Sequence, residues 1–274
     1  MGRRSIGERR RAFRALHKSG CFVLPNPWDA GSAVALAGLG FKALASTSAG
    51  HAWSCGAADG TLDRAQVLAH VRMLVDATDL PVNADFGSGF GDDADAVHES
   101  VLMAVATGAA GISIEDASGD PAQPLRSIED SVARLRAARA AIDASGGDTL
   151  LIGRAENFFV GHGDLDDTVM RLRAYAEAGA DCLYAPGIRT PAQIAAVVQA
   201  AGGKPVNLLI GSPTGMSVDD AARLGVRRIS LGGALARSAW AGFLQAAAAI
   251  AGQGRFTALA ATPTGADLER MLGR

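Results

Sequence analysis

The stretch "PVNADFGSGFGDDADAV", residues 81–97, holds the pattern that decides the fold. A short apolar run stops at a single acid, Asp85, and a loop with Gly87, Gly89 and Gly91 follows before an acidic helix start. A strand, a tight loop and a helix in this order form the repeating unit of a parallel sheet with helical connections. The rest of the chain repeats the same unit.

Eight short apolar runs alternate with segments of helical periodicity. They span residues 21–25, 42–46, 81–85, 111–116, 150–156, 182–186, 204–211 and 227–233. Four of them follow a glycine at a helix end, where glycine tolerates the left-handed conformation that turns the chain into the next strand. Eight such units in about 250 residues match the size of a (β/α)₈ barrel. We predict an α/β fold, a single (β/α)₈ TIM-type barrel over residues 1–274, with a doubly wound open sheet as the alternative.

Composition and charge exclude several classes of protein. The 274 residues are 49% hydrophobic and 20% charged, which is typical of a globular protein with a sizeable core. A net charge of −2 provides no global positive field for nucleic acid or anionic membrane, so we expect neither as a partner. The three cysteines are far apart and form no CxxC pair, which fits a reducing, cytoplasmic location.

Both ends of the chain are predicted to be helical. Residues 1–20 are basic and lack the apolar core of a signal peptide, so we expect a solvated first helix, with an RNA-binding or transit segment as the alternative. Residues 234–274 form a C-terminal helical region that carries Trp240 and Phe243 beside a long alanine run. A helix that is apolar on most sides must be buried on more than one of them. The alternative is an ordinary barrel helix in which alanine serves helix propensity.

A ring of polar side chains follows the predicted strands. In this fold the catalytic groups lie at the carboxyl ends of the strands, while the barrel interior is filled by Val, Ile and Leu. Polar side chains at strand ends therefore indicate a functional site. They are Ser46, Thr47, Ser48, Asn83, Asp85, Glu115, Asp116, Arg154, Glu156, Tyr184 and Asn207.

Asp85 and Glu115 end two neighbouring strands, the third and the fourth. Two carboxylates suit Mg²⁺, which takes one or two of them, keeps several waters and leaves positions for substrate oxygens. The alternatives are a helix cap or an ion pair with a nearby arginine. Asp59, in the loop after the second strand, could reach the metal through water, or it could only form a turn with Gly60.

Arg154, at the end of the fifth strand, could clamp a carboxylate through two parallel hydrogen bonds. The alternative is an internal salt bridge with Glu156 or Glu115. The segment from Ser46 to Gly50 could form an anion-binding nest of backbone amides, or only a polar turn. None of the five histidines shows the spacing of metal ligands, so we assign them no chemical role.

Several motifs together resemble the isocitrate lyase / phosphoenolpyruvate mutase superfamily. They are the segment 26–60, "VNADFGSGFGDD", "GISIEDASGDP", "LLIGRAENFF", "AEAGADCLYAPG" and "GVRRISLGGALARSA". The resemblance implies an α/β barrel that binds Mg²⁺ (or Mn²⁺) and makes or breaks C–C or P–C bonds next to a 2-oxo acid, through a pyruvate-like enolate. It also implies an eighth helix that swaps onto a neighbouring subunit, giving a homodimer or homotetramer.

The resemblance and the polar ring together suggest roles for most residues of the ring and for Asp59. Arg154 and Asp59 would be catalytic, and Asp85 and Glu115 would bind the metal, with Asp59 and Asn83 reaching it through water. The residues expected to bind substrate are Ser46, Thr47, Ser48, Arg154, Tyr184 and Asn207.

The sequence departs from the superfamily pattern at three places. Asn83-Ala84-Asp85 stands where the family has Asp-x-Asp, the loop 117–126 lacks the catalytic Cys of the lyases, and Pro186 follows Tyr184-Ala185 where the mutases place a His. We therefore expect a Mg²⁺-dependent lyase or decarboxylase of small 2-oxo or 2-hydroxy carboxylates such as oxaloacetate. The alternatives are a protein that only binds 2-oxo acids and a phosphonate mutase-like enzyme.

Overall fold

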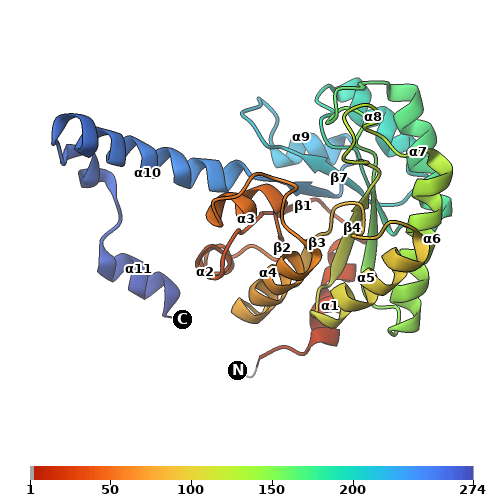
Figure 1. Ribbon diagram of the computed structural model, residues 1–274, viewed down its shortest axis with the longest axis horizontal. Helices are drawn as coiled ribbons and strands as arrows, with labels where there is room; N and C mark the ends of the chain where they lie inside the picture. Colours follow the sequence, from red (N-terminus) through yellow and green to blue (C-terminus); the bar gives the residue numbers. More distant parts are fainter. Residues whose placement is uncertain (1–2, 274) are drawn as a thin grey trace.

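Eight parallel strands form a barrel in the computed structural model, which describes residues 3–273 (Figure 1). They are β1 (Phe22–Leu24), β2 (Leu44–Ala45), β3 (Val82–Asp85), β4 (Gly111–Glu115), β5 (Leu150–Arg154), β6 (Cys182–Tyr184), β7 (Val206–Leu209) and β8 (Arg228–Ser230). Their order is β1-β8-β7-β6-β5-β4-β3-β2, and the Ala45 N–H donates to the Pro25 carbonyl at 3.0 Å where the two ends meet. The predicted (β/α)₈ barrel is confirmed. An open doubly wound sheet would reverse its strand order in the middle.

Helices connect the strands and cover the outside of the barrel. They are α1 (Ile6–Leu16), α2 (Ala30–Gly38), α3 (Ser48–Ser54), α4 (Arg64–Ala77), α5 (Ala94–Ala106), α6 (Ile128–Ala144), α7 (Leu165–Glu177), α8 (Pro191–Ala200) and α9 (Val218–Arg223). The four glycines predicted to end helices, Gly40, Gly108, Gly179 and Gly225, have φ angles of 90°, 91°, 104° and 91°. These left-handed conformations turn the chain from a helix into β2, β4, β6 and β8.

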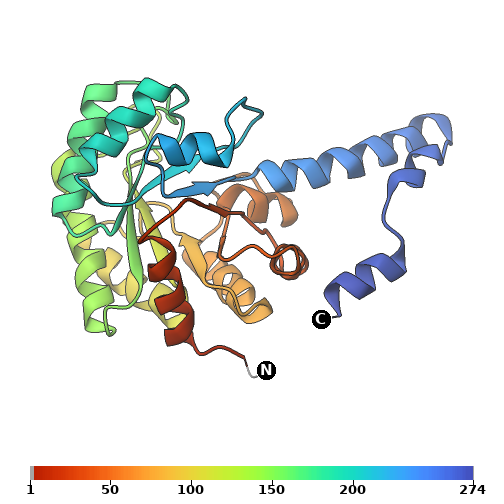
Figure 2. The same cartoon turned by 180° about the vertical axis from the view of Figure 1, so that it is seen from behind.

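The basic first helix closes the amino-terminal end of the barrel (Figure 2). Phe13 is fully buried among residues of the strands. Arg9 donates to the carbonyls of Val75 and Thr78 at the end of α4, and Arg10 donates to the carbonyl of Val105 near the end of α5. Cations stabilise the carbonyl ends of helices. The basic side chains therefore attach α1 to the barrel.

The C-terminal region leaves the barrel. Helix α10 (Ala234–Gln253) points away from the strands and is followed by a 3₁₀ turn (Thr257–Ala261) and α11 (Gly265–Leu272) (Figures 1 and 2). Of the residues of α10 only Ala236 is buried, while Trp240 and Phe243 are 37% and 60% exposed. A single chain thus leaves the apolar surface of α10 uncovered. Within residues 3–273, no helix has the length and apolar character needed to cross a membrane.

Candidate active site

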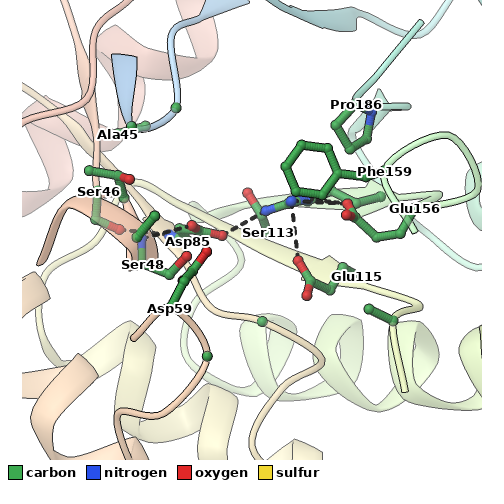
Figure 3. A pocket seen from close by; sticks show the side chains of 18 of the residues that line it. Ala45, Ser46, Ser48, Asp59, Asp85, Ser113, Glu115, Glu156, Phe159 and Pro186 are labelled. Carbon is green, nitrogen blue, oxygen red and sulfur yellow. Dashed lines mark hydrogen bonds and ion pairs between the residues drawn. The ribbon is translucent and has the colours of Figure 1, made fainter. Parts of the chain in front are cut away.

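A cavity of about 460 Å³ opens at the carboxyl ends of the strands, where the sequence placed the site (Figure 3). Of the residues predicted to be catalytic, to bind substrate or to bind metal, all except Asn207 line it: Ser46, Thr47, Ser48, Asp59, Asn83, Asp85, Glu115, Arg154 and Tyr184. They come from loops and strand ends spread over more than a hundred residues of sequence, and the barrel brings them to one place.

Arg154 lines this cavity and contacts three carboxylates. Its Nη1 is 2.6 Å from Oδ1 of Asp85, and its Nη2 is 3.2 Å from Oε2 of Glu115 and 2.9 Å from Oε1 of Glu156. Figure 3 shows the three acids pointing toward one another from β3, β4 and the residues after β5. The internal salt bridges considered for Arg154 are therefore present, with Asp85 as an additional partner.

The cluster formed by Arg154, Asp85, Glu115 and Glu156 contains three carboxyl groups and one guanidinium. Burial raises the pKa of Glu115 to about 8, and the neighbouring Glu156 and Asp85 add to this effect although Arg154 opposes it. Burial likewise raises the pKa of Glu156. A single guanidinium does not offset three partly buried carboxylates. A further cation beside Asp85 and Glu115 would stabilise their charged forms.

The two strand-end carboxylates fit a hard divalent cation. Asp85 and Glu115 offer oxygen ligands from adjacent strands, and Mg²⁺ commonly takes two carboxylates and fills its other positions with water and substrate. In the described part of the chain, no three His, Cys, Asp or Glu side chains gather closely enough to hold a metal by themselves. This donor set fits an open catalytic site better than a closed structural one. Asp59 is exposed at the mouth of the cavity.

The segment from Ser46 to Gly50 holds Asp85 in place. The Ser46 hydroxyl accepts from the Asp85 N–H at 2.7 Å, and the Ser48 N–H donates to Asp85 Oδ2 at 3.1 Å. The Thr47 hydroxyl caps α3 by accepting from the Gly50 N–H. A Cβ on Gly50 would lie 2.7 Å from the Thr47 side chain, so glycine is needed for this close turn. The backbone amide of Ser48, predicted to bind an anion, is occupied by the Asp85 carboxylate.

Two asparagines lie deeper than predicted, around a buried arginine. Arg228 donates to the side-chain oxygen of Asn207 at 2.8 Å and lies 3.4 Å from that of Asn83. The amide nitrogens of Asn83 and Asn207 donate to Ser113 and Ser230. Asn207 is fully buried and does not line the cavity, so the structure does not bring it to the site as the sequence suggested. Arg228, which was not predicted, lines the cavity floor.

Arg228 is the least compensated charge near the site. It is 2% exposed, and no carboxylate among residues 3–273 pairs with it. Burial lowers its pKa. The alternation of side chains along β8 could have indicated that this arginine points inward, but the adjacent Arg227 made the choice ambiguous.

Tyr184 and Asp116 have different environments at their strand ends. The guanidinium of Arg154 lies 4.9 Å from the centre of the Tyr184 ring, a cation–π contact that restricts the arginine. Burial raises the pKa of Tyr184 to about 12.

Asp116 points away from the cavity and accepts from Arg171 at 3.0 Å and from Tyr175 at 2.6 Å. It therefore supports the wall of the barrel.

Two histidines that the sequence left without a role also line the cavity. The rings of His51 and His70 stack with centroids 3.7 Å apart and planes 2° apart, and the His70 Nε2 lies 3.0 Å from the Trp28 carbonyl. Burial lowers the pKa of both, that of His70 to about 4. The Sγ of Cys55 lies 3.9 Å from both ring nitrogens of His51. The i, i+4 spacing of these two residues in the sequence could have indicated that they are neighbours on one helix.

Comparison with known proteins agrees with this geometry. Residues 13–251 match the family model for phosphoenolpyruvate phosphomutase. An oxaloacetate decarboxylase from Paraburkholderia xenovorans (strain LB400) is 31% identical over 233 residues, which cover 81% of this chain and 74% of that protein.

Solved structures of similar proteins include members of the same superfamily. A proposed lyase/mutase from Burkholderia cenocepacia J2315 has 47% identity and a TM-score of 0.94, and the match covers 98% of this chain and 97% of that one. A phosphonopyruvate hydrolase complex with oxalate and Mg²⁺ has 28% identity and a TM-score of 0.86, with 97% and 95% covered. Because the family match spans nearly all of the barrel, this chain belongs to the phosphoenolpyruvate phosphomutase family, within the isocitrate lyase / phosphoenolpyruvate mutase superfamily.

Proposed function

We propose that the protein is a Mg²⁺-dependent (or Mn²⁺-dependent) lyase or decarboxylase that acts on small 2-oxo or 2-hydroxy carboxylates through an enolate. The observation that carries this proposal is the meeting of Arg154 with Asp85 and Glu115 at the mouth of the barrel. The similarity to an oxaloacetate decarboxylase supports the choice of substrate class.

Four polar side chains of the cavity have a task in this proposal. Arg154 offers a planar fork to the carboxylate of the substrate, since guanidinium donors match carboxylate geometry. Asp85 and Glu115 would hold the cation, and Asp59 would reach it through water. When bound, the cation supplies the positive charge that stabilises an enolate oxygen. The largely buried surroundings of Arg154 lower the local dielectric and strengthen these contacts.

Decarboxylation of a substrate such as oxaloacetate requires fewer catalytic side chains than the other reactions considered. The bond from C3 to the leaving carboxylate breaks, its electron pair forms the C2–C3 double bond of the enolate, and CO₂ departs. The C3 carbon then takes one proton from solvent at the open mouth. No general base is needed, which agrees with the loop 117–126 and its lack of Cys, Lys and His. That loop is ordered by a bridge between Ala117 and Leu125.

The test is to incubate the protein with a set of 2-oxo and 2-hydroxy acids that includes oxaloacetate. NMR then monitors product formation, in the presence of Mg²⁺ and in the presence of a chelator. We expect a 2-oxo acid product that requires Mg²⁺. Replacing Arg154 with Lys should lower kcat/KM by about a hundredfold, because a lysine cannot form two parallel hydrogen bonds. Binding of these acids without any turnover would support the alternative of a binding protein, and absence of both would overturn the proposal.

We also propose that the protein is a homodimer or homotetramer in which α10 packs on a neighbouring subunit. The support is the exposure of Trp240, Phe243 and Leu244, at 37%, 60% and 56%, on a helix that leaves its own barrel. Exposed apolar patches of this kind mark interaction surfaces.

A further inference from the structure

A second cavity, of about 720 Å³, opens beside the active-site cavity. We call it the side chamber. The two cavities share a boundary formed by Ala49, Asp59, Phe159, Leu209, Gly232 and Gly233. The six shared residues make the two cavities neighbours, and Phe159 and Leu209 lie on the boundary between them.

Polar side chains such as Asp59, Ser212 and Thr214 line part of the side chamber, and large apolar residues line the rest. They include Trp53, Phe158, Ile188, Leu208, Met216 and Leu231, from α3, β7 and the segments that follow β5, β6, β7 and β8. At the boundary, Phe159 is 62% exposed, although a large aromatic side chain is usually covered. Binding pockets of this size and composition take ligands with a substantial apolar part. A four-carbon acid such as oxaloacetate would leave the side chamber empty.

Among residues 3–273, two exposed arginines bring positive charge to the side chamber. Arg189 follows β6, and Arg237 lies at the start of α10. Arg237 is fixed at the rim by donation to the Gly211 carbonyl. Across residues 3–273, neither arginine has a carboxylate partner within 4.0 Å, in contrast to Arg154. Unpaired guanidinium groups beside an apolar wall are suited to an anionic group at the far end of a ligand.

We propose that the natural substrate is a 2-oxo or 2-hydroxy acid with an apolar chain that ends in a second carboxylate. The reacting end lies at Arg154, the chain passes Phe159 and Leu209, and the distal carboxylate meets Arg189 and Arg237. This inference rests on the proposed function, because it takes the reacting end of the substrate from it.

Calorimetric titration of the full-length chain with Mg²⁺ tests the proposal. The ligands are oxalate, 2-oxoadipate, 2-oxooctanoate and 2-oxooctanedioate. We expect affinity to rise about threefold for each added methylene that enters the side chamber, since each buried CH₂ contributes favourably. The diacid 2-oxooctanedioate should bind about tenfold more tightly than the monoacid 2-oxooctanoate, because only the diacid reaches the two arginines.

Two variants with matched controls test whether the gain in affinity for longer diacids arises in the side chamber. Met216→Trp fills the side chamber, and Met170→Trp places the same group on the exposed outer face of α7. Arg237→Gln removes a rim charge, and Arg255→Gln removes an exposed charge beyond α10. We expect the first variant of each pair to raise the ratio of the 2-oxooctanedioate Kd to the oxalate Kd about tenfold. The controls should leave this ratio unchanged.

The outcomes separate this inference from the proposed function. If oxalate binds but affinity does not depend on chain length or on Met216 and Arg237, the side chamber does not hold substrate and only the inference fails. If neither oxalate nor any longer acid binds, the proposed function is wrong and the inference falls with it.

Discussion

The Nη1 of Arg154 lies 2.6 Å from Oδ1 of Asp85, although the two residues end strands that are separated by β4 in the barrel. This ion pair spans the end of β4, and both of its partners line the cavity. Both partners are also fixed from behind, Asp85 by the Ser48 N–H and Arg154 by the ring of Tyr184. The site is thus held in position before any substrate arrives, which is what a preorganised catalytic centre needs.

The first prediction concerns Arg154. Arg154→Gln leaves Asp85, Glu115 and Glu156 without their cation, so we expect a loss of about 3 kcal/mol in unfolding free energy, measured in urea without Mg²⁺. Mg²⁺ should restore part of this loss by taking the place of the guanidinium charge. The control is Arg223→Gln, which removes an exposed pair with Asp220 and should cost less than about 1 kcal/mol. Equal effects of the two variants would contradict the importance of the cluster.

Part of the acid sensitivity should come from His17, and the buried His70, whose pKa is also lowered, should add to it. The Nδ1 of His17 lies 2.8 Å from the Phe13 carbonyl and therefore carries the proton, while its Nε2 faces Arg228 at 3.4 Å. Burial and the charge of Arg228 lower the pKa of His17 to about 3. The folded state then binds a proton less readily than the unfolded state, in which the pKa is near 6.5. Stability present above pH 6.5 is lost as the pH falls, by about 2 kcal/mol at pH 5.

Urea unfolding at pH 7.5 and pH 5 checks this expectation. His17→Gln should reduce the fall in unfolding free energy between the two pH values, whereas the exposed control His162→Gln should not change it. A His17→Gln variant with the pH dependence of the original protein would show that this ring does not contribute to the acid sensitivity.

Asn83→Asp should have little effect on the metal. A carboxylate at position 83 would lie beside Arg228, which has no acidic partner among the described residues, and the two charges would offset one another. We therefore expect the Kd for Mg²⁺, measured by calorimetry, to change less than about threefold. Tightening by about tenfold would instead place this side chain in direct contact with the metal or its waters.

Assembly depends on α10 in our proposal. Trp240 packs against Phe243 with ring centres 5.5 Å apart, on the uncovered side of the helix. Trp240→Glu should shift the mass measured by light scattering from an oligomer toward a monomer, because it places a charge in a buried apolar contact. Val218→Glu, at an exposed position of α9, is the control. The proposal would be refuted if the unmodified protein has the mass of a monomer at micromolar concentration. It would also be refuted if the Trp240→Glu variant keeps the mass of the original oligomer.

The sequence was sufficient to predict the barrel and the centre of the site. The period of strand, loop and helix, with helix-ending glycines such as Gly108 and Gly179, determines eight parallel strands. In such a barrel the ends of neighbouring strands must converge. This is why Asp85, Glu115 and Arg154 could be grouped before the structure was known.

Depth and packing could not be read from the sequence. Asn83 and Asp85 share one face of β3, but only the barrel geometry shows that Asn83 lies one layer lower, beside Arg228. The stacking of His51 on His70 depends on how α3 packs against α4. The side chamber is assembled from segments that follow five different strands, so no local sequence pattern predicts it.

Oxalate binding tests the central proposal most directly, because oxalate is a planar dianion with the shape of a pyruvate enolate. Calorimetric titration should show binding with Mg²⁺ and none with a chelator. Asp85→Asn should weaken binding by about a hundredfold, while Asp95→Asn, in the first turn of α5, should not change it. Thermal melting confirms that both variants are folded. Equal oxalate binding with and without Mg²⁺, or in Asp85→Asn, would contradict a metal-dependent enolate site between Asp85, Glu115 and Arg154.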